Sequence, residues 1–304
     1  MASQAPPAGS AVASHRTGTF LVLAATIAWS FSGSFTRVLE TDVMTAITLR
    51  SFFGGSFLLL AFSALNGRQT LAPFTRMQGA DWALVVAQAV CQACTVGAFY
   101  HTTIANTAVI YATAPFIAAG FAFYFVGERM PPRTMVACAT AFAGVLIIVS
   151  SGFGAGHLVG DLLALLMTTT FALIIVIPRA YSGTQMMPAT VLSAFLTAAA
   201  FAPFSHLPHV SAADVATLAA FGLMNFTVAM YLFLAGSRRI SAAQAALIGT
   251  LEIVLAPLWA WLIFGERPSL ATLVGGGLIL AIVVWHTHRD MQFERARDRS
   301  CFAP

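Results

Sequence analysis

The chain has 304 residues, of which 59% are hydrophobic and only 9% are charged. Soluble globular proteins carry about 25% charged residues, so this composition excludes a water-soluble protein and indicates a chain surrounded mostly by lipid. All 15 basic residues are arginines, and a chain without lysine has neither a P-loop nor a lysine Schiff base, which excludes ATP-driven work by this chain alone.

The N-terminal segment 1–17 is small and polar and includes Pro6 and Pro7. It lacks a cleavage site followed by a soluble domain, so we expect a disordered tail rather than a signal peptide. The four cysteines lie in apolar stretches or near the C-terminus, without the spacing of a disulfide framework.

Ten apolar stretches follow one another along the chain. A helix needs about 20 apolar residues to cross about 30 Å of hydrocarbon, because it must pair its own backbone groups in lipid. We therefore predict an all-α membrane protein with ten transmembrane helices. They are expected over residues 18–39, 44–65, 81–101, 107–126, 134–151, 160–178, 187–204, 212–236, 242–264 and 270–285.

The arginines predict the orientation of these helices. With a cytoplasmic N-terminus, twelve of the 15 arginines fall in cytoplasmic segments, only Arg37 and Arg267 fall outside, and Arg50 lies within a span. Arginine is retained on the cytoplasmic side of membranes. We therefore expect a multi-pass protein of the bacterial inner membrane with both termini in the cytoplasm, including a short charged C-terminal tail over residues 286–304.

The strongest organisational signal is an internal repeat. Gly127-Glu128-Arg129 and Gly265-Glu266-Arg267 each follow an apolar helix and lie 138 residues apart, and segments 105–110 and 243–248 align at the same offset. At an offset of 142, Trp29 meets Phe171 and Arg37 meets Arg179. This pattern predicts two five-helix halves, over residues 18–151 and 152–285.

Because five is odd, the second half must enter the membrane from the opposite face. The sequence therefore predicts a 5+5 inverted-topology repeat. Such repeats are characteristic of secondary transporters, whose substrate site lies near the midplane between the halves.

Several weak motifs, in order and spacing, together resemble one family. They are Trp29, Arg50 followed by Phe52, the segment 243–247, Leu251-Glu252, the paired Gly-Glu motifs and the run from Gly275 to Ile279. The chain resembles the EamA-type ten-helix exporters of the drug/metabolite transporter superfamily over about residues 18 to 285. The resemblance implies alternating-access export of a small metabolite, with an amino acid as the expected cargo.

One departure from the family pattern concerns the ninth span. The family usually has proline directly after the mid-helix glutamate, whereas here Ile253 follows Glu252 and Pro257 comes one turn later. We therefore expect any kink of this helix near Pro257, while Pro115 occupies the expected position in the first half. Both prolines are predicted hinge residues.

Two ionisable residues lie inside predicted spans. Glu252 lies about 16 Å from the inner end of its helix, where a carboxylate costs at least about 2.5 kcal/mol and is expected to face the bundle interior. Glu252 could bind cargo or a proton. Alternatively, a protonated Glu252 could stabilise the packing of helices. The equivalent residue in the first half is Ala114. We expect the side chain of Arg50 to form hydrogen bonds with backbone carbonyls at a helix end, with substrate contact as the alternative.

Polar and aromatic residues at helical spacing predict a cavity lining. Gln88, Gln92, Thr95 and Phe99 form one stripe of the third helix. Other spans add further candidates, namely Trp29, Tyr100, Tyr111, Thr168, Thr169, Asn225, Thr227 and Tyr231. About half of these should line the path, and the rest should form interhelical hydrogen bonds. The aromatic residues among these candidates favour an aromatic or bulky apolar amino acid as the cargo.

Other motifs receive a structural interpretation. Cys91 and Cys94 are expected to pack as apolar residues, and His286 with Asp290 should form a solvated exit from the last helix rather than a metal site. Gly275 to Gly277 should let helices approach closely. We expect a small-molecule substrate and the lipid bilayer as partners, no cofactor, no metal and no nucleic acid.

Two questions stay open at this stage. Proton exchange at Glu252 would make the protein an antiporter, and a permanently protonated Glu252 would make it a uniporter. The alternatives to a carrier are a membrane-embedded enzyme acting on lipid or isoprenoid, although its acids are scattered, and a channel.

Overall fold

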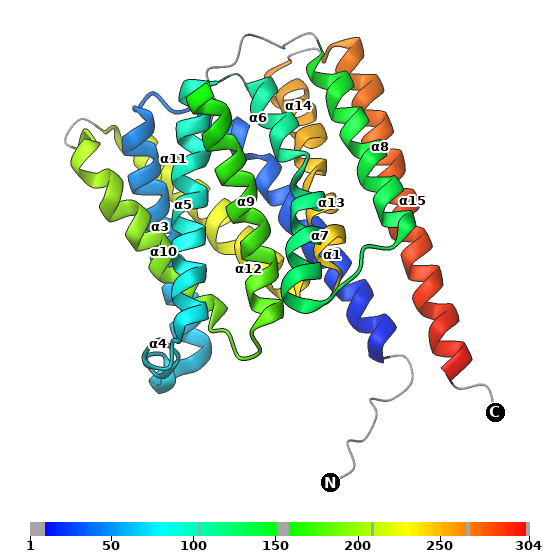
Figure 1. The fold of residues 1–304 in the computed structure, drawn as a ribbon. Coiled ribbons are helices and arrows are strands. Elements are labelled where there is room, and N and C mark those ends of the chain that lie inside the picture. The colour runs from blue at the N-terminus through cyan, green and yellow to red at the C-terminus, as the bar shows by residue number, and fades with distance from the viewer. Residues whose placement is uncertain (1–9, 103, 151–157, 208–209, 266–267, 302–304) are drawn as a thin grey trace.

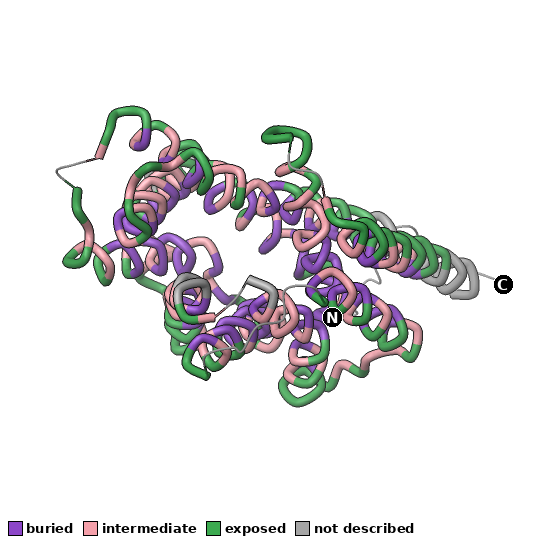
Figure 2. The backbone as a smooth tube through the Cα atoms, turned by 90° about the horizontal axis from the view of Figure 1, so that it is seen from above, coloured by how far each residue is buried: buried purple, intermediate pink, exposed green. Residues whose placement is uncertain are grey.

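The computed structural model describes residues 10–102, 104–150, 158–207, 210–265 and 268–301. The described residues form a bundle of helices that lie roughly side by side (Figure 1). The first turns of α1 and the last turns of α15 lie toward the same end of this bundle (Figure 1). Seen along the bundle, buried positions lie on helix sides that face other helices, and exposed positions lie on the outer rim (Figure 2).

Within the residues that the structure describes, the first half contains nine helical elements. They are α1 (Ser10–Ser30), α2 (Ser32–Arg37), α3 (Val43–Asn66), η1 (Gly67–Gln69), α4 (Ala72–Thr75), α5 (Gly79–His101), α6 (Ile104–Tyr111), α7 (Ala114–Val126) and α8 (Pro132–Val149).

The second half also has five spans, but its first span is the single helix α9, and the eighth span of the chain contains a π-helix. Its described elements are α9 (Leu158–Ala180), α10 (Met186–Phe201), η2 (Ala202–Phe204), α11 (Ala212–Phe221), the π-helix η4 (Gly222–Val228), α12 (Ala229–Ser237), α13 (Ala242–Gly249), α14 (Leu251–Phe264) and α15 (Leu270–Cys301).

Nine helical stretches in the described ranges are long and apolar enough to cross a membrane. Helix α5 has 23 residues, which is also the length of a membrane span. The prediction of an all-α membrane protein with ten spanning helices is confirmed. Two ends differ from expectation: α1 already begins at Ser10, inside the predicted tail, and α15 continues as a helix beyond residue 285.

The repeated Gly-Glu motif has a local structural reason. Gly127 ends α7 and Gly265 ends α14, both in the left-handed backbone conformation with φ of 74° and 72°. Glycine adopts this conformation without the steric cost that a Cβ would add. The motif therefore marks the same helix C-cap in both halves; Glu266 and Arg267 lie outside the described residues.

Two spans are interrupted at corresponding places in the two halves. The fourth span breaks between α6 and α7, where the Thr113 hydroxyl donates to the Ile110 carbonyl at 2.6 Å. The ninth span breaks between α13 and α14, where the Thr250 hydroxyl donates to the Leu247 carbonyl at 2.6 Å. Such bonds from threonine to the preceding turn bend helices.

The break in the ninth span lies at Thr250, whereas α14 continues as a helix through Pro257. The hinge expected at Pro257 therefore does not coincide with this break and stays a prediction. In the first half Pro115 is buried in the first turn of α7, directly after the break.

Glycine also brings the last helices of the two halves together. A Cβ built on Gly144 of α8 would lie 2.9 Å from the carbonyl oxygen of Gly275 in α15. The close approach that the glycine run predicts therefore occurs within the chain, between α8 and α15.

Candidate functional site

Residues that the repeat makes equivalent touch each other in the middle of the bundle. The rings of Trp29 in α1 and Phe171 in α9, equivalent at an offset of 142, are 6.3 Å apart. Tyr111 and Gly249 are equivalent at an offset of 138, and a Cβ on Gly249 would lie 3.4 Å from the Tyr111 hydroxyl. Two residues that a two-fold axis relates lie at equal distances from the axis, on opposite sides of it. Equivalent residues that touch each other therefore lie beside the pseudo-two-fold axis that relates the inverted halves.

Four rings form an aromatic cluster at this axis. Phe171 lies 5.5 Å from Tyr111 and 5.6 Å from Phe233, and Trp29 lies 4.9 Å from Phe233. The rings come from α1, α6, α9 and α12, so four helices from both halves meet here. Phe233 was missed in the sequence, because nothing distinguishes it from the other phenylalanines. The sequence distinguishes Phe171 only by its equivalence to Trp29 in the repeat.

The interrupted helices end at the same place. Tyr111 is the last residue of α6 and Gly249 is the last residue of α13. Glu252 lies in the first turn of α14, where the free N–H groups of a helix start favour negative charge. Discontinuous helices in corresponding positions of inverted halves typically form the substrate site of secondary transporters.

Glu252 is half-buried and close enough to Tyr111 to interact electrostatically. Across the described part of the chain it has neither a hydrogen bond nor an ion pair. A carboxyl group at this depth usually has a partner, or it faces a cavity or the path of an ion. Its environment therefore leaves it available to cargo or to a proton.

The two glutamines of the predicted stripe have different surroundings. Gln88 is fully buried; its amide donates to the Thr190 hydroxyl at 3.1 Å and its carbonyl accepts from the Ser193 hydroxyl at 2.8 Å. Gln88 therefore joins α5 to α10 and is not brought to the axis. Both amide atoms of Gln92 are enclosed and have no hydrogen-bond partner in the residues described, so Gln92 does not link two helices as Gln88 does.

A second group of contacts surrounds the break between α1 and α2. The Trp29 indole donates to the carbonyl of Asn225 at 3.0 Å, and the Asn225 amide donates to the Ser32 hydroxyl at 2.7 Å. Trp259 of α14 donates to the Ser30 hydroxyl at 2.8 Å, and its ring stacks on Phe31 at 4.3 Å. These contacts join the first half to the second half on the α2 side of the aromatic cluster.

Trp259 was missed as a candidate. It lies seven residues after Glu252, on the same face of the ninth span. Its helical spacing from Glu252 was the signal that could have found it.

Other predicted lining residues lie elsewhere. Tyr231 is 44% exposed on α12, because Phe233 takes the inward position two residues later. The Thr169 hydroxyl donates to the Leu165 carbonyl of its own helix at 2.7 Å. The side chains of Phe99 and Tyr100 lie outside the described residues.

Arg50 also differs from its expected role. In the part of the chain that the structure describes it has no hydrogen bond to a carbonyl, and its guanidinium lies over the Phe221 ring at 5.1 Å. The expectation that it satisfies carbonyls at a helix end was wrong, because it lies within α3, where the helix pairs its own carbonyls.

The end of the bundle near the start of α1 is held by an ion pair between the halves. Arg179 of α9 lies 3.0 Å from Glu128, which follows α7, and also donates to the carbonyls of Ser237 and Ile240. Glu128 in turn accepts from the backbone N–H of Ala242 at 3.3 Å. We call these contacts the inner clasp.

Two further groups lie near this end. His286 and Asp290 are 1% and 7% exposed, so the expectation of a solvated exit was wrong. His286 bonds to the Thr134 hydroxyl at 2.9 Å and Asp290 pairs with Arg133 at 2.9 Å, which joins α15 to α8. Arg238 donates to the Thr184 carbonyl at 3.1 Å, and partial burial lowers the pKa of its guanidinium.

At the opposite end of the bundle Asp42 caps α3. It accepts from the backbone and hydroxyl of Thr45 and lies 3.5 Å from the ring of His206. Burial alone would raise the pKa of Asp42, but the Thr45 bonds and the neighbouring imidazole together hold that pKa below its ordinary value.

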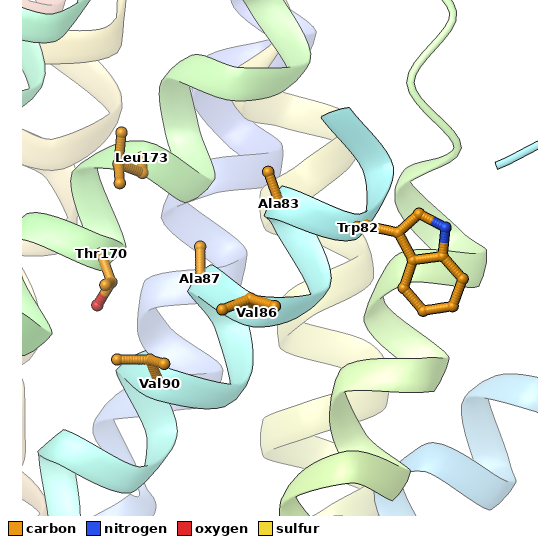
Figure 3. Close-up of a pocket in the computed structure, with 7 residues that line it drawn as sticks. All are labelled: Trp82, Ala83, Val86, Ala87, Val90, Thr170 and Leu173. Atoms are coloured by element: carbon orange, nitrogen blue, oxygen red, sulfur yellow. The ribbon is translucent and has the colours of Figure 1, made fainter. Parts of the chain in front are cut away.

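The surface also has an apolar groove of about 450 Å³ between α5 and α9 (Figure 3). Its lining comprises Trp82, Ala83, Val86, Ala87, Val90, Thr170 and Leu173. Trp82 and Val86 are each 54% exposed, and the Thr170 hydroxyl is already bonded within its own helix. The groove therefore suits lipid hydrocarbon and is separate from the site at the axis.

Comparisons with known proteins bear on the family and the fold of the chain. The model of the EamA-like transporter family matches the chain twice, over residues 16–150 and 158–287. A solved structure described only as the crystal structure of a protein covers 88% of this chain and 96% of its own length, with a TM-score of 0.72 and 18% identity. At that identity the likeness shows the fold alone. Comparison with curated protein sequences finds no match.

Proposed function

Since the chain belongs to the EamA-like transporter family, we propose that it exports amino acids, preferably aromatic or bulky apolar ones, by alternating access through the site at the pseudo-two-fold axis. The proposed location is the bacterial inner membrane, with both termini in the cytoplasm. Membrane transport of a small molecule follows from the family; the cargo, the direction and the mechanism are the proposal.

The observation that carries the proposal is the contact between repeat mates at the two helix breaks. The aromatic cluster offers rings on which an apolar side chain packs. Gln92 and Glu252 lack partners of their own among the described residues. Ligand sites combine mostly apolar walls with a few such polar groups.

The contacts at the two ends support alternating access. The inner clasp joins the halves at one end, and Trp259 with Asn225 joins them beyond the aromatic cluster on the other side. Releasing one set while keeping the other would open the axis site to one side of the membrane at a time.

We further propose that Glu252 couples export to protons. Its carboxyl lies at a helix start, which favours the charged form, and it has no partner of its own among the described residues, so it can release and take up a proton during the transport cycle. Export would then be an exchange of cargo for a proton.

The test uses purified protein in proteoliposomes and radiolabelled L-phenylalanine. We expect saturable counterflow, and an acidic vesicle interior should drive phenylalanine uptake at least tenfold above the level without a pH gradient. Glu252→Gln should keep counterflow and lose this response, whereas Glu40→Gln, a change at an exposed loop residue, should keep both.

The results separate the parts of the proposal. Wild-type counterflow that ignores the pH gradient would show a uniporter and contradict proton coupling. Lack of saturable counterflow for every amino acid supplied, or a single-channel current in its place, would contradict the amino-acid carrier.

A further inference from the structure

Arg50 is a cation held inside the bundle. It lies on the face of α3 that packs against α11 and η4, since a Cβ on Gly222 would lie 2.7 Å from its carbonyl oxygen. Its guanidinium carbon is 5.1 Å from the centre of the Phe221 ring, which is buried and stacks on Phe35 of α2 at 5.0 Å. The side chain thus points to the junction of α2, α3 and α11.

No protein group within the described ranges compensates this charge. Arg50 has neither an ion pair nor a hydrogen bond, and its Nε is enclosed without a partner. The acids on the neighbouring elements are engaged elsewhere. Asp42 binds Thr45, and Asp214 accepts from the backbone N–H of Glu40.

Two other partly buried arginines differ from Arg50 in having a carboxylate partner. Arg133 and Arg179 lie 2.9 Å and 3.0 Å from carboxylates. Charged groups inside a membrane are normally paired or lie on the path of a substrate. The face of an aromatic ring attracts the cation but cannot accept its N–H groups in the plane of the guanidinium.

We propose that Arg50, lying over Phe221, is the subsite for the carboxylate of the transported molecule. A guanidinium offers two parallel N–H groups that match the two oxygens of a carboxylate. Arg50 is only partly buried, so part of the side chain stays open to a ligand.

The position of this subsite fits a cargo with a carboxylate and an apolar side chain. Phe221 precedes Asn225 by four residues, about 6 Å along the helix, and the Asn225 carbonyl accepts from Trp29. A carboxylate at Arg50 would therefore lie about one helical turn from the aromatic cluster. The intervening η4 is a π-helix, a form common at functional sites. This inference rests on the proposed function, because it assigns the carboxylate of the proposed amino-acid cargo.

The direct test measures binding of 3-phenylpropionate and of its neutral amide, 3-phenylpropionamide, to purified protein in detergent. The wild type should bind the carboxylate at least tenfold more tightly than the amide, equivalent to about 1.4 kcal/mol. Arg50→Gln should abolish this preference and Arg50→Lys should reduce it at least threefold. Arg37→Gln should keep it, because Arg37 is exposed although it also lies over a ring, that of Phe264.

Equal binding of the two probes by the wild type would overturn the subsite, as would an undiminished preference in Arg50→Gln. If Arg50→Gln does not fold, an undiminished preference in Arg50→Lys would overturn it instead. Counterflow of L-phenylalanine separates this result from the proposed function. Carriage of phenylalanine with an unchanged KM in Arg50→Gln would refute the subsite alone. Lack of carriage, with Arg50-dependent binding of 3-phenylpropionate, would refute the amino-acid cargo alone.

Discussion

Gln88 and Gln92 lie one turn apart on α5 and illustrate how surroundings divide chemically identical residues. Gln88 has both ends of its amide bonded to α10, whereas the amide of Gln92 is enclosed without a partner in the described structure. The same side chain therefore links two helices in one case and, under the proposed function, is left to bind cargo in the other.

This contrast gives a matched pair of variants. Gln88→Ala removes two interhelical hydrogen bonds and should lower the free energy of unfolding by about 1 kcal/mol, from typical values for such bonds in membranes. Its KM for cargo should stay unchanged. Gln92→Ala should leave stability within about 0.5 kcal/mol of the wild type and raise KM. Thermal unfolding in detergent and counterflow kinetics measure the two effects, and an equal loss of stability in both variants would contradict the division.

The sequence places both glutamines on one stripe but does not reveal their partners. Thr190 and Ser193 lie about 100 residues further along the chain and look like any other small polar residues of a span. The same limit applies to Tyr231 and Phe233, because helical spacing alone does not say which side of α12 faces the axis. Trp29, Tyr111 and Glu252 could be chosen as candidates because each carries a polar or ionisable group, and such groups in mid-membrane normally face the interior.

Among the elements, the interrupted spans show how far local signals reach. The positions of the spans follow from apolar length, and the expected boundaries agree with the described helices mostly within a few residues. The break in the ninth span could not be placed from proline, because it lies at Thr250, seven residues before Pro257. Where a threonine bonds back to its own helix depends on the local backbone, which composition does not specify.

The inner clasp gives a prediction about helix ends. Glu128→Gln removes the negative charge with which the first half holds Arg179 of the second half, so the ends of α7 and α13 should separate more often. We expect a cysteine introduced at Ala242, which is fully buried, to react with a maleimide at least fivefold faster in the Glu128→Gln background. A fivefold faster reaction needs the free energy of separating the helix ends to fall by only about 1 kcal/mol, which is within the range for a hydrogen bond to a charged group.

A control separates this effect from a general loosening of the same end. Asp290→Asn breaks the ion pair with Arg133 between α8 and α15 and should leave the reaction at position 242 unchanged. Equal acceleration in both backgrounds would show that the inner clasp has no specific role.

For the whole molecule, the inverted repeat predicts that equivalent residues lie on opposite sides of the membrane. Glu40 and Ser182 are both exposed and equivalent at an offset of 142. In a cysteine-free background, a membrane-impermeant maleimide should label Glu40→Cys in intact spheroplasts and Ser182→Cys only after lysis. Labelling of both from one side would contradict the inverted arrangement, and labelling in the reverse order would contradict the cytoplasmic termini.

At this scale the sequence was most informative. Arginine bias, the number of apolar stretches and the repeat each constrain the same topology, so their agreement leaves few alternatives. The cargo is not constrained in this way, because it depends on the arrangement of a few side chains at the axis.

The π-helix between α11 and α12 has a mechanical consequence. Its wider turn accommodates more residues than an α-helical turn of the same height. If η4 tightened to α-helical winding, the segment beyond it would swivel by about 100° and advance by about 1.5 Å for each surplus residue released. Asn225 lies inside η4, so this rewinding would turn it away from the Trp29 indole and uncouple the first helix from the eighth.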